Sequence, residues 1–458
     1  MAQTVPAVDL EGARAAALAA LDASADSLVR LSKYIHSNPE IALEEVKASA
    51  ACAEFLDERG FAVERGVADL PTAFSAKVGQ TGPTIGFLSE YDALPGLGHG
   101  CGHNLIAIAG VGAGIGLSAA LPYLGTGRVA VFGTGSWGTA FAGVLADAGN
   151  EVRLWGRRPE LVERINETRV NADYLPDLVL PNEVEATADP DHALEGADLV
   201  VLAVPSQRLR ANLASWTGLA ASEAPIVSLM KGIELGTSLR MTEVIGEVTG
   251  AGPERLAVVS GPNLAREIAA RQPAASVVAS ASHHTADLVA EACATPYFRP
   301  YTDTDVIGCE LGGATKNVVA VAVGIAEGMG MGDNTKATII TRGLAETVRL
   351  GVALGAQPGT FSGLAGVGDL IATCMSPLSR NHRVGVGLGQ GGSLADVVAA
   401  TKQTAEGVTS CESILALAQR VGVEVPICEA VVAIVIDGHR PQLIADSLMA
   451  RERKREKH

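Results

Sequence analysis

The stretch RVAVFGTGSWGTAFAGVLADAG, residues 128–149, constrains the fold more than any other part of this sequence. It predicts a buried strand, a GxGxxG turn formed by Gly133, Gly135 and Gly138, and an apolar helix that follows at once. Such glycines permit a tight turn and the close approach of a pyrophosphate, which the free N–H groups at the helix N-terminus can bind. A second strand-like run, EVRLWG, comes next. The order favours a dinucleotide-binding site over the alternative of a merely structural turn.

The pattern of apolar segments divides the chain into regions. Residues 127–306 alternate strand-like and helical runs, among them ADLVVLAVP and LAVVSGP, which indicates a parallel sheet covered on both faces. Residues 307–450 are typical of long helices rich in Ala, Gly and Leu, and residues 451–458 form a basic tail. Residues 1–124 predict helices and short strands. We therefore expect an α/β protein: a truncated α/β segment, a Rossmann-type doubly wound parallel sheet, and an all-α C-terminal domain.

Charge and cysteine content narrow the class of protein. The formal net charge of −16 over 458 residues argues against a nucleic-acid-binding surface. The seven cysteines are scattered and include no CxxC, which indicates reduced thiols rather than a disulfide framework. The sequence has neither a basic signal-peptide start nor an uninterrupted apolar run of about 18 residues. We expect a cytoplasmic protein that is not an integral membrane protein; a homodimer is compatible with the sequence.

Two arginines indicate the cofactor preference. An NAD-specific site would carry an acidic residue about 20 residues beyond the glycines, to bind the ribose hydroxyls. This chain has Arg157 and Arg158 near that position. Guanidinium groups suit the 2′-phosphate of NADP, although solvated surface arginines are the alternative. The sequence favours NADP and keeps NAD open.

Lysines are the best candidates for proton transfer. Lys316 lies in the nearly all-apolar run GGATKNVVAVAVG, where an isolated ammonium is costly to bury. A lysine that extends its amine to solvent is the weaker alternative. Lys231 follows a strand-like run, in SLMKGIE, where ligands gather in open α/β sheets. Two such lysines close together would depress the pKa of one of them and give a base usable near neutral pH.

Residues suited to an anionic substrate follow later in the chain. Asp369 precedes the compact donor set Ser379, Arg380 and Asn381. Arg380 is suited to bidentate contact with a phosphate. On spacing alone this set is only suggestive.

From Val129 to about Gly438 the sequence resembles the bacterial glycerol-3-phosphate dehydrogenases. The resemblance rests on VFGTGSWGTA, VPSQ, SLMKGIE, VVSGPNLAREIA, GGATKNVVAVAVGIAEGMGMGDNTKATIITRGLAE, GLAGVGDLIATC and SRNHRVG, in that order. It implies reversible hydride transfer between NAD(P)H and dihydroxyacetone phosphate, giving sn-glycerol 3-phosphate for phospholipid synthesis. Lys316 would be the proton acceptor in the oxidative direction.

The same resemblance implies roles for individual residues. Those implied for the cofactor are Gly133, Gly135, Ser136, Trp137, Gly138, Arg157, Arg158, Tyr174, Lys231, Ala265, Arg380 and Glu406. Those implied for the substrate are Lys231, Gly261, Asn263, Lys316, Asp369, Ser379, Arg380 and Asn381. Three positions depart from the family: Asn263 replaces a frequent Ser or Thr, and Thr404-Ala405 replaces an aliphatic pair before Glu406.

Residues of about 28–121 resemble a different family, the zinc-dependent amidohydrolases of the aminoacylase and carboxypeptidase type. LVRLSKYIHSNPEIALEE and FLSEYDALPGLGHGCGHNLIA carry this resemblance, which implies metal ligation by Cys101 and His103. The family's further ligands and catalytic Glu-Glu motif do not follow, since Glu44-Glu45 precedes the site. We expect no metal centre and a non-catalytic remnant; a sequence rearrangement and a packing or oligomerisation module are the alternatives.

Three other functions are open to the whole chain. A two-domain dehydrogenase of the 6-phosphogluconate or 3-hydroxyisobutyrate type shares the lysine base but lacks the SRN and GLAGVGDL stretches. A metal-dependent hydrolase with an appended cofactor-sensing part would require bound zinc. A non-enzymatic nucleotide sensor would need neither the base nor the phosphate clamp.

Overall fold

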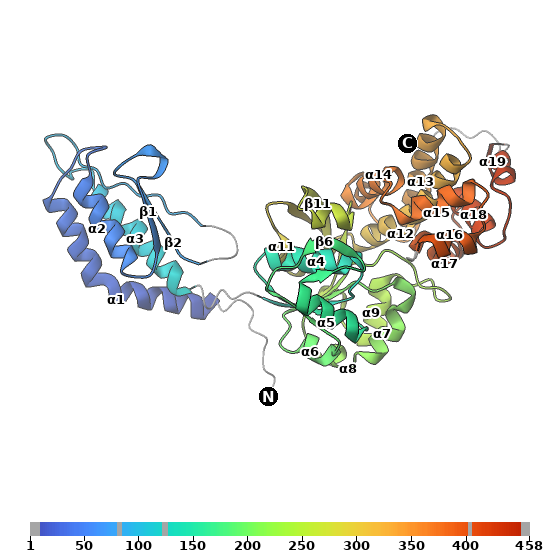
Figure 1. Cartoon of the computed structure of the whole chain (residues 1–458), viewed down its shortest axis with the longest axis horizontal. Helices are drawn as coiled ribbons and strands as arrows, with labels where there is room; N and C mark the ends of the chain where they lie inside the picture. The colour runs from blue at the N-terminus through green and yellow to red at the C-terminus, as the bar shows by residue number, and fades with distance from the viewer. Residues whose placement is uncertain (1–9, 80–84, 121–126, 402–404, 450–458) are drawn as a thin grey trace. The chain divides into compact units, whose positions relative to one another are not determined.

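The computed structural model describes residues 10–79, 85–120, 127–401 and 405–449. The basic tail therefore lies outside the described residues. The chain divides into two compact units, Met1–Thr126 and Gly127–His458, and each is described by itself (Figure 1).

The N-terminal unit is built from three helices and a strand pair. The apolar faces of the helices meet in a small core that includes Ile35, Cys52 and Val111. The two strands pair antiparallel, with Val63 opposite Ala76. The elements are α1 (Leu10–Ser37), α2 (Val46–Asp57), β1 (Ala62–Arg65), the 3-10 turn η1 (Val67–Asp69), β2 (Phe74–Lys77) and α3 (His103–Ala120).

The second unit begins with an eight-stranded sheet of order β12-β11-β10-β9-β8-β3-β4-β7. Its strands are β3 (Arg128–Phe132), β4 (Glu151–Trp155), β7 (Val184–Thr187), β8 (Leu199–Leu202), β9 (Ile226–Ser228), β10 (Leu256–Ser260), β11 (Ala274–Ser280) and β12 (Phe298–Asp303). A small antiparallel hairpin of β5 (Val170–Asn171) and β6 (Leu175–Val179) stands apart from it. The expected Rossmann-like sheet is present.

The sheet differs from the prediction in one pairing. β10 and β11 run antiparallel, whereas the other neighbouring strands run parallel. The chain turns back between these two strands through the short helix α10 (Ala265–Ala269) instead of crossing a face of the sheet on a long helix. The sheet is therefore mixed and dominated by parallel pairs.

Helices cover both faces of the sheet because side chains on a strand alternate between its faces. Val129 and Val131 of β3 join the core on one face with α4 (Ser136–Asp147), α5 (Pro159–Thr168) and α11 (His283–Cys293). Ala130 and Phe132 join the core on the opposite face. The helices there are α6 (Pro190–Leu194), α7 (Leu209–Ser215), α8 (Thr217–Ala221) and α9 (Met241–Thr249), accompanied by the 3-10 turns η3 (Ser206–Arg208) and η4 (Pro253–Arg255).

The helical part of the second unit surrounds α12 (Val306–Gly328), whose N-terminus is capped by Asp305, which accepts a hydrogen bond from the Gly308 N–H at 2.9 Å. α12 and α3 both have the length and apolar character of a membrane span, but α12 is 83% buried within the protein, as a core helix is. The other elements are α13 (Asp333–Ala353), η5 (Pro358–Ser362), the π-helical turn η6 (Leu364–Gly368), α14 (Asp369–Met375), α15 (Arg380–Gly389), α16 (Leu394–Thr401), α17 (Glu406–Arg420), α18 (Pro426–Val435) and α19 (Pro441–Met449).

Glycines bring α12 and α15 into direct backbone contact. Gly324 and Gly328 on α12 face Gly385 and Gly389 on α15, and a Cβ at any of the four would strike a backbone carbonyl oxygen of the partner helix. The lack of side chains at this crossing lets the two backbones approach closely. The contact fixes the helix that begins at Arg380 against the helix that carries Lys316.

Candidate active site

The glycine-rich loop has a distinct structural reason for each of its three glycines. Gly133 has a φ of 132°, and a Cβ there would strike the carbonyl of Ala203. A Cβ on Gly138 would strike the Gly133 carbonyl, so this glycine allows α4 to pack against the loop. Gly135 has no neighbour within 4 Å of its Cβ position. The loop is therefore open where a pyrophosphate would approach the N-terminus of α4.

Residues predicted to contact the cofactor lie near this loop. Ser136 and Trp137 form the first turn of α4, and the half-buried Trp137 and Tyr174 pack against the core of the sheet. The end of β4 contributes Arg157, which is exposed, and Arg158, which pairs with Asp173 at 2.8 Å. The Arg157 guanidinium is therefore the exposed positive charge at the end of β4.

The two predicted lysines meet at one carboxylate. Lys316 hydrogen-bonds Asp369 Oδ1, and its Nζ lies 2.7 Å from the Thr373 hydroxyl. Lys231 Nζ lies 2.7 Å from Asp369 Oδ2 and 2.9 Å from the Gly261 carbonyl oxygen. β9, α12 and α14 thus bring together two amines and one acid that are far apart in sequence. Thr373 was not predicted from the sequence, although its spacing of four residues from Asp369 places both on one face of a helix.

The environment lowers the pKa of Lys316 to about 8. Burial is the largest cause, since it disfavours the ammonium form, and the Lys231 charge acts in the same direction. The carboxylate of Asp369 opposes both effects. Lys316 is 7% exposed, so its amine is withdrawn from bulk solvent and can exchange a proton near neutral pH.

Two asparagines join the lysine site to α15 and α17. Asn317 Nδ2 donates to the Lys231 carbonyl oxygen at 3.2 Å, and Asn381 Nδ2 donates to Asn317 Oδ1 at 2.9 Å. The Gly407 N–H then donates to Asn381 Oδ1 at 2.9 Å. Asn381 was predicted from the sequence and Asn317 was not, although its position directly after Lys316 was the available signal.

The remaining predicted residues of the helical part lie close to these asparagines in sequence. The Ser379 hydroxyl caps α15 by accepting the His382 N–H at 3.3 Å, and Arg380 is half-buried at the first position of that helix. Burial raises the pKa of Glu406, the first residue of α17, while the charges of Arg380 and Lys231 oppose that rise. Thr404 lies outside the described residues.

The loop after β10 supplies polar groups on the sheet side. Gly261 has a φ of 146°, which suits glycine. Asn263 Nδ2 donates to the Ser276 hydroxyl at 3.1 Å, and its Oδ1 is buried with no hydrogen-bond partner among the described residues. α10 begins at Ala265. The substituted residue Asn263 thus keeps a free acceptor.

Comparisons with known proteins match this second unit. Residues 128–286 match the N-terminal profile, and residues 305–446 the C-terminal profile, of NAD-dependent glycerol-3-phosphate dehydrogenase. The chain is 63% identical over 330 residues to an NAD(P)+ glycerol-3-phosphate dehydrogenase of Streptomyces coelicolor, covering 72% of this chain and 98% of the relative. The corresponding protein of Thermobifida fusca is 59% identical over 332 residues, covering 72% and 99%. The chain belongs to the NAD-dependent glycerol-3-phosphate dehydrogenase family.

A solved structure supports the same conclusion about this dehydrogenase. The crystal structure of glycerol-3-phosphate dehydrogenase from Coxiella burnetii aligns with a TM-score of 0.68 and 36% identity, covering 71% of this chain and 99% of that one. The dehydrogenase is therefore an oxidoreductase with the family's Rossmann-like sheet and helical C-terminal part. As a family member it uses NAD or NADP.

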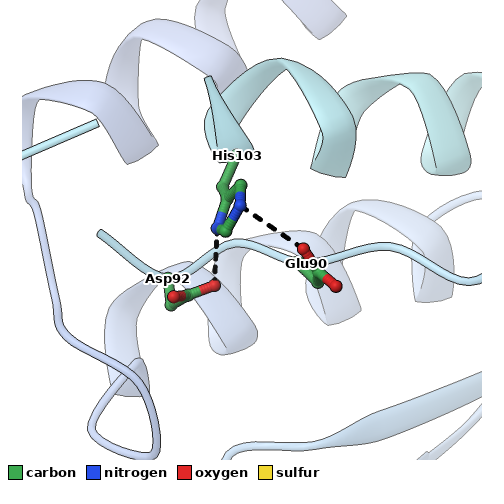
Figure 2. A group of neighbouring side chains, drawn as sticks. All are labelled: Glu90, Asp92 and His103. Atoms are coloured by element: carbon green, nitrogen blue, oxygen red, sulfur yellow. Dashed lines mark hydrogen bonds and ion pairs between the residues drawn. The ribbon is translucent and has the colours of Figure 1, made fainter. Parts of the chain in front are cut away.

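The N-terminal unit brings three ionisable side chains together, as Figure 2 shows. His103 Nδ1 lies 2.7 Å from Asp92 Oδ1, and His103 Nε2 lies 3.4 Å from Glu90 Oε2. Each ring nitrogen thus faces a different carboxylate. The implied zinc ligand Cys101 is exposed and does not belong to this group. The Cys101–His103 ligand pair that the resemblance implies is therefore not part of this group.

The second residue of the Glu44-Glu45 pair is held by hydrogen bonds within the N-terminal unit. Glu45 is buried, accepts the Thr72 hydroxyl at 2.8 Å and accepts the Leu43 N–H at 2.9 Å. These bonds occupy its carboxylate in holding the chain before α2. Glu45 does not belong to the group around His103.

Proposed function

We propose that residues 127–458 catalyse reversible reduction of dihydroxyacetone phosphate to sn-glycerol 3-phosphate, with Lys316 as the proton acceptor and donor. The observation that carries the residue assignment is the buried amine of Lys316, held by Asp369 and Thr373 with a pKa of about 8. Family membership supports the reaction class. The product would supply phospholipid synthesis in the cytoplasm.

The residues around the amine define the proton step. In the oxidative direction, neutral Lys316 takes the proton of the substrate hydroxyl; in the reductive direction, protonated Lys316 returns it to the carbonyl oxygen. Asp369 accepts from both lysines, so it fixes the direction of the Lys316 amine and holds the Lys231 amine beside it. The nicotinamide supplies or accepts the hydride when it is bound.

The residues around this centre suit a phosphorylated three-carbon substrate. We propose that Arg380 and Asn381 bind the phosphate end, with Ser379 at the start of the same helix. Asn263 offers its free Oδ1 to a substrate hydroxyl, and Gly261 holds Lys231 in place through its carbonyl. Binding energy at the phosphate would then orient the reacting carbon.

The cofactor assignment follows from the loop. We propose that Gly133, Gly135 and Gly138 admit the pyrophosphate. Contacts to the rest of the cofactor are proposed for Ser136, Trp137, Arg157, Arg158, Tyr174, Lys231, Ala265, Arg380 and Glu406. The open space at Gly135 and the exposed Arg157 favour this placement and favour NADP over NAD.

We propose that residues 1–124 are an amidohydrolase-like remnant with no hydrolytic role. The separation of Cys101 from the His103 group and the structural environment of Glu45 support this view. The proposed division of the rest is 127–306 for cofactor binding and 307–450 for the helical substrate part. A homodimer is the proposed assembly.

The test is NADPH oxidation with dihydroxyacetone phosphate by the full chain, by residues 127–458, and by the variants Lys316→Ala and Lys316→Arg. Arginine keeps the positive charge but cannot titrate near neutral pH. We expect rapid oxidation by both wild-type proteins and a loss of about 10²–10⁴-fold in both variants, the size of a general acid–base contribution. Unphosphorylated dihydroxyacetone should react poorly. Inactivity of both wild-type proteins would overturn the proposal.

A further inference from the structure

The carboxylate of Asp173 lies among arginines at the end of β4. Its Oδ2 accepts from Arg158 Nη2 at 2.8 Å, and its Oδ1 accepts from Arg164 Nη2 at 2.9 Å. Arg157 forms no hydrogen bond or ion pair within the described part of the chain. Two of the three guanidinium groups are thus engaged by one acid, and one remains free.

The hairpin that carries Asp173 is fastened to the glycine-rich loop. The buried Asn171 donates from Nδ2 to the Thr134 carbonyl at 2.9 Å and to the Thr139 hydroxyl at 2.8 Å. Gly156 packs against the same loop residue, since a Cβ there would lie 2.7 Å from Thr134 Cγ2. The hairpin, the loop and the end of β4 therefore meet at Thr134. In a Rossmann fold this is the region that receives the adenosine ribose.

We infer that Asp173 is a specificity-determining residue that lets the enzyme accept NAD(H) alongside NADP(H). The inference rests on the proposed function of this cofactor site. Asp173 takes the role of the acidic residue that is missing at the end of β4, because each of its oxygens keeps a second lone pair for a ribose 2′-hydroxyl.

The Asp173 carboxylate, which favours binding of a ribose 2′-hydroxyl, disfavours binding of a 2′-phosphate. Its negative charge repels the phosphate, and it occupies one guanidinium nitrogen of Arg158, Nη2, that the phosphate would otherwise use. Asp173 thereby offsets part of the advantage that Arg157 and Arg158 give to NADP(H). Both effects move the preference toward NAD(H).

The test compares Asp173→Asn with Asp177→Asn by measuring the dissociation constants of NADPH and NADH on the full chain. Asparagine preserves the side-chain shape and removes the charge. Asp177 is an exposed acid on β6 of the same hairpin, so its variant controls for net charge. We expect Asp173→Asn to raise the ratio of NADPH to NADH affinity about fivefold or more, equivalent to about 1 kcal/mol. Asp177→Asn should leave the ratio within about twofold of wild type.

An unchanged ratio in Asp173→Asn, or an equal rise in Asp177→Asn, would overturn the inference. Because the readout is binding, it stands apart from turnover. Failure of the wild-type enzyme to reduce dihydroxyacetone phosphate would overturn the proposed function. If the wild-type enzyme is active but Asp173→Asn leaves the ratio of NADPH to NADH affinity unchanged, only the role of Asp173 is overturned. Thermal melting of both variants provides the check on folding.

Discussion

The Asp369 group of the second unit and the His103 group of the first unit differ in how far their charged side chains are buried. In the second unit, Asp369 is 1% exposed and holds two lysines, and Glu310 is 4% exposed and pairs with Arg240 at 2.6 Å. In the first unit, the His103 group includes a Glu90 side chain that is 68% exposed. The difference teaches that a cluster of charged side chains can be closed off from solvent, as around Lys316, whose pKa burial lowers to about 8, or left partly in water.

The apolar residues show the same contrast. The second unit has large cores on both faces of its sheet and around α12. The first unit has one small core, and it leaves Leu88 99% exposed and Leu97 75% exposed. A small core covers little apolar surface, so each buried contact there carries a larger share of the unit's stability.

The largest expected effect compares one aspartate from each unit. Asp369→Asn removes the carboxylate that accepts from both Lys231 and Lys316, which leaves two largely buried amines facing each other. We expect the reduction of dihydroxyacetone phosphate to fall by about 10²-fold or more. Asp92→Asn makes the same change beside His103 and should leave turnover unchanged. Equal losses in steady-state assays of the two variants would break the comparison.

The next prediction concerns pH. The base must be neutral to accept a proton, and the neutral fraction of a group with a pKa of about 8 rises about tenfold per pH unit below that value. We expect kcat/KM for glycerol 3-phosphate oxidation to rise with pH and level off above about 8. The reductive direction needs the protonated amine and should decline above the same pH.

The wild-type pH profile has two controls. Lys316→Arg should lose this inflection, because its side chain does not titrate in the range. His103→Gln should keep it, because His103 lies in the unit to which no turnover is assigned. Loss of the inflection in His103→Gln, with the inflection retained in Lys316→Arg, would contradict the assignment of Lys316 as the base.

The smallest expected effect compares two helix glycines. A Cβ at Gly385 would strike a backbone carbonyl of α12, whereas a Cβ at Gly112 of α3 would meet the side chains of Leu21 at 3.3 Å and Leu28 at 3.7 Å. We expect Gly385→Ala to lower the free energy of unfolding by about 2 kcal/mol through overpacking. Gly112→Ala should be neutral or stabilising by up to about 1 kcal/mol, since alanine favours the helix. Chemical denaturation of both variants measures the difference, and equal effects would contradict the packing argument.

Much of the second unit could be predicted because its signals are local. The strand, glycine turn and helix of residues 128–147 appear where the sequence placed them. Lys316 stood out because a charged residue in an apolar helix must find partners. Such inferences need only the residues within one or two elements.

The missing parts depend on contacts between distant segments. The antiparallel β10–β11 pair depends on the path of a short connection, which apolar periodicity does not report. Thr373 and Asn317 acquire their roles only when α14 and β9 come next to α12. The Asp173 carboxylate likewise gains importance through a hairpin fastened at Thr134. The spacing of residues along the sequence carries no direct information on contacts between such distant segments.

The bridge from Lys231 to Asp369 has a consequence for how the enzyme can be observed. Lys231 follows a strand of the sheet, whereas Asp369 and Lys316 belong to the helical part. Any separation of these two parts would remove one charge from beside the Lys316 amine and admit water to it. The pKa of the Lys316 amine therefore reports how closely the sheet and the helical part are packed together. Isotopic labelling of this lysine would allow that pKa to be followed during turnover.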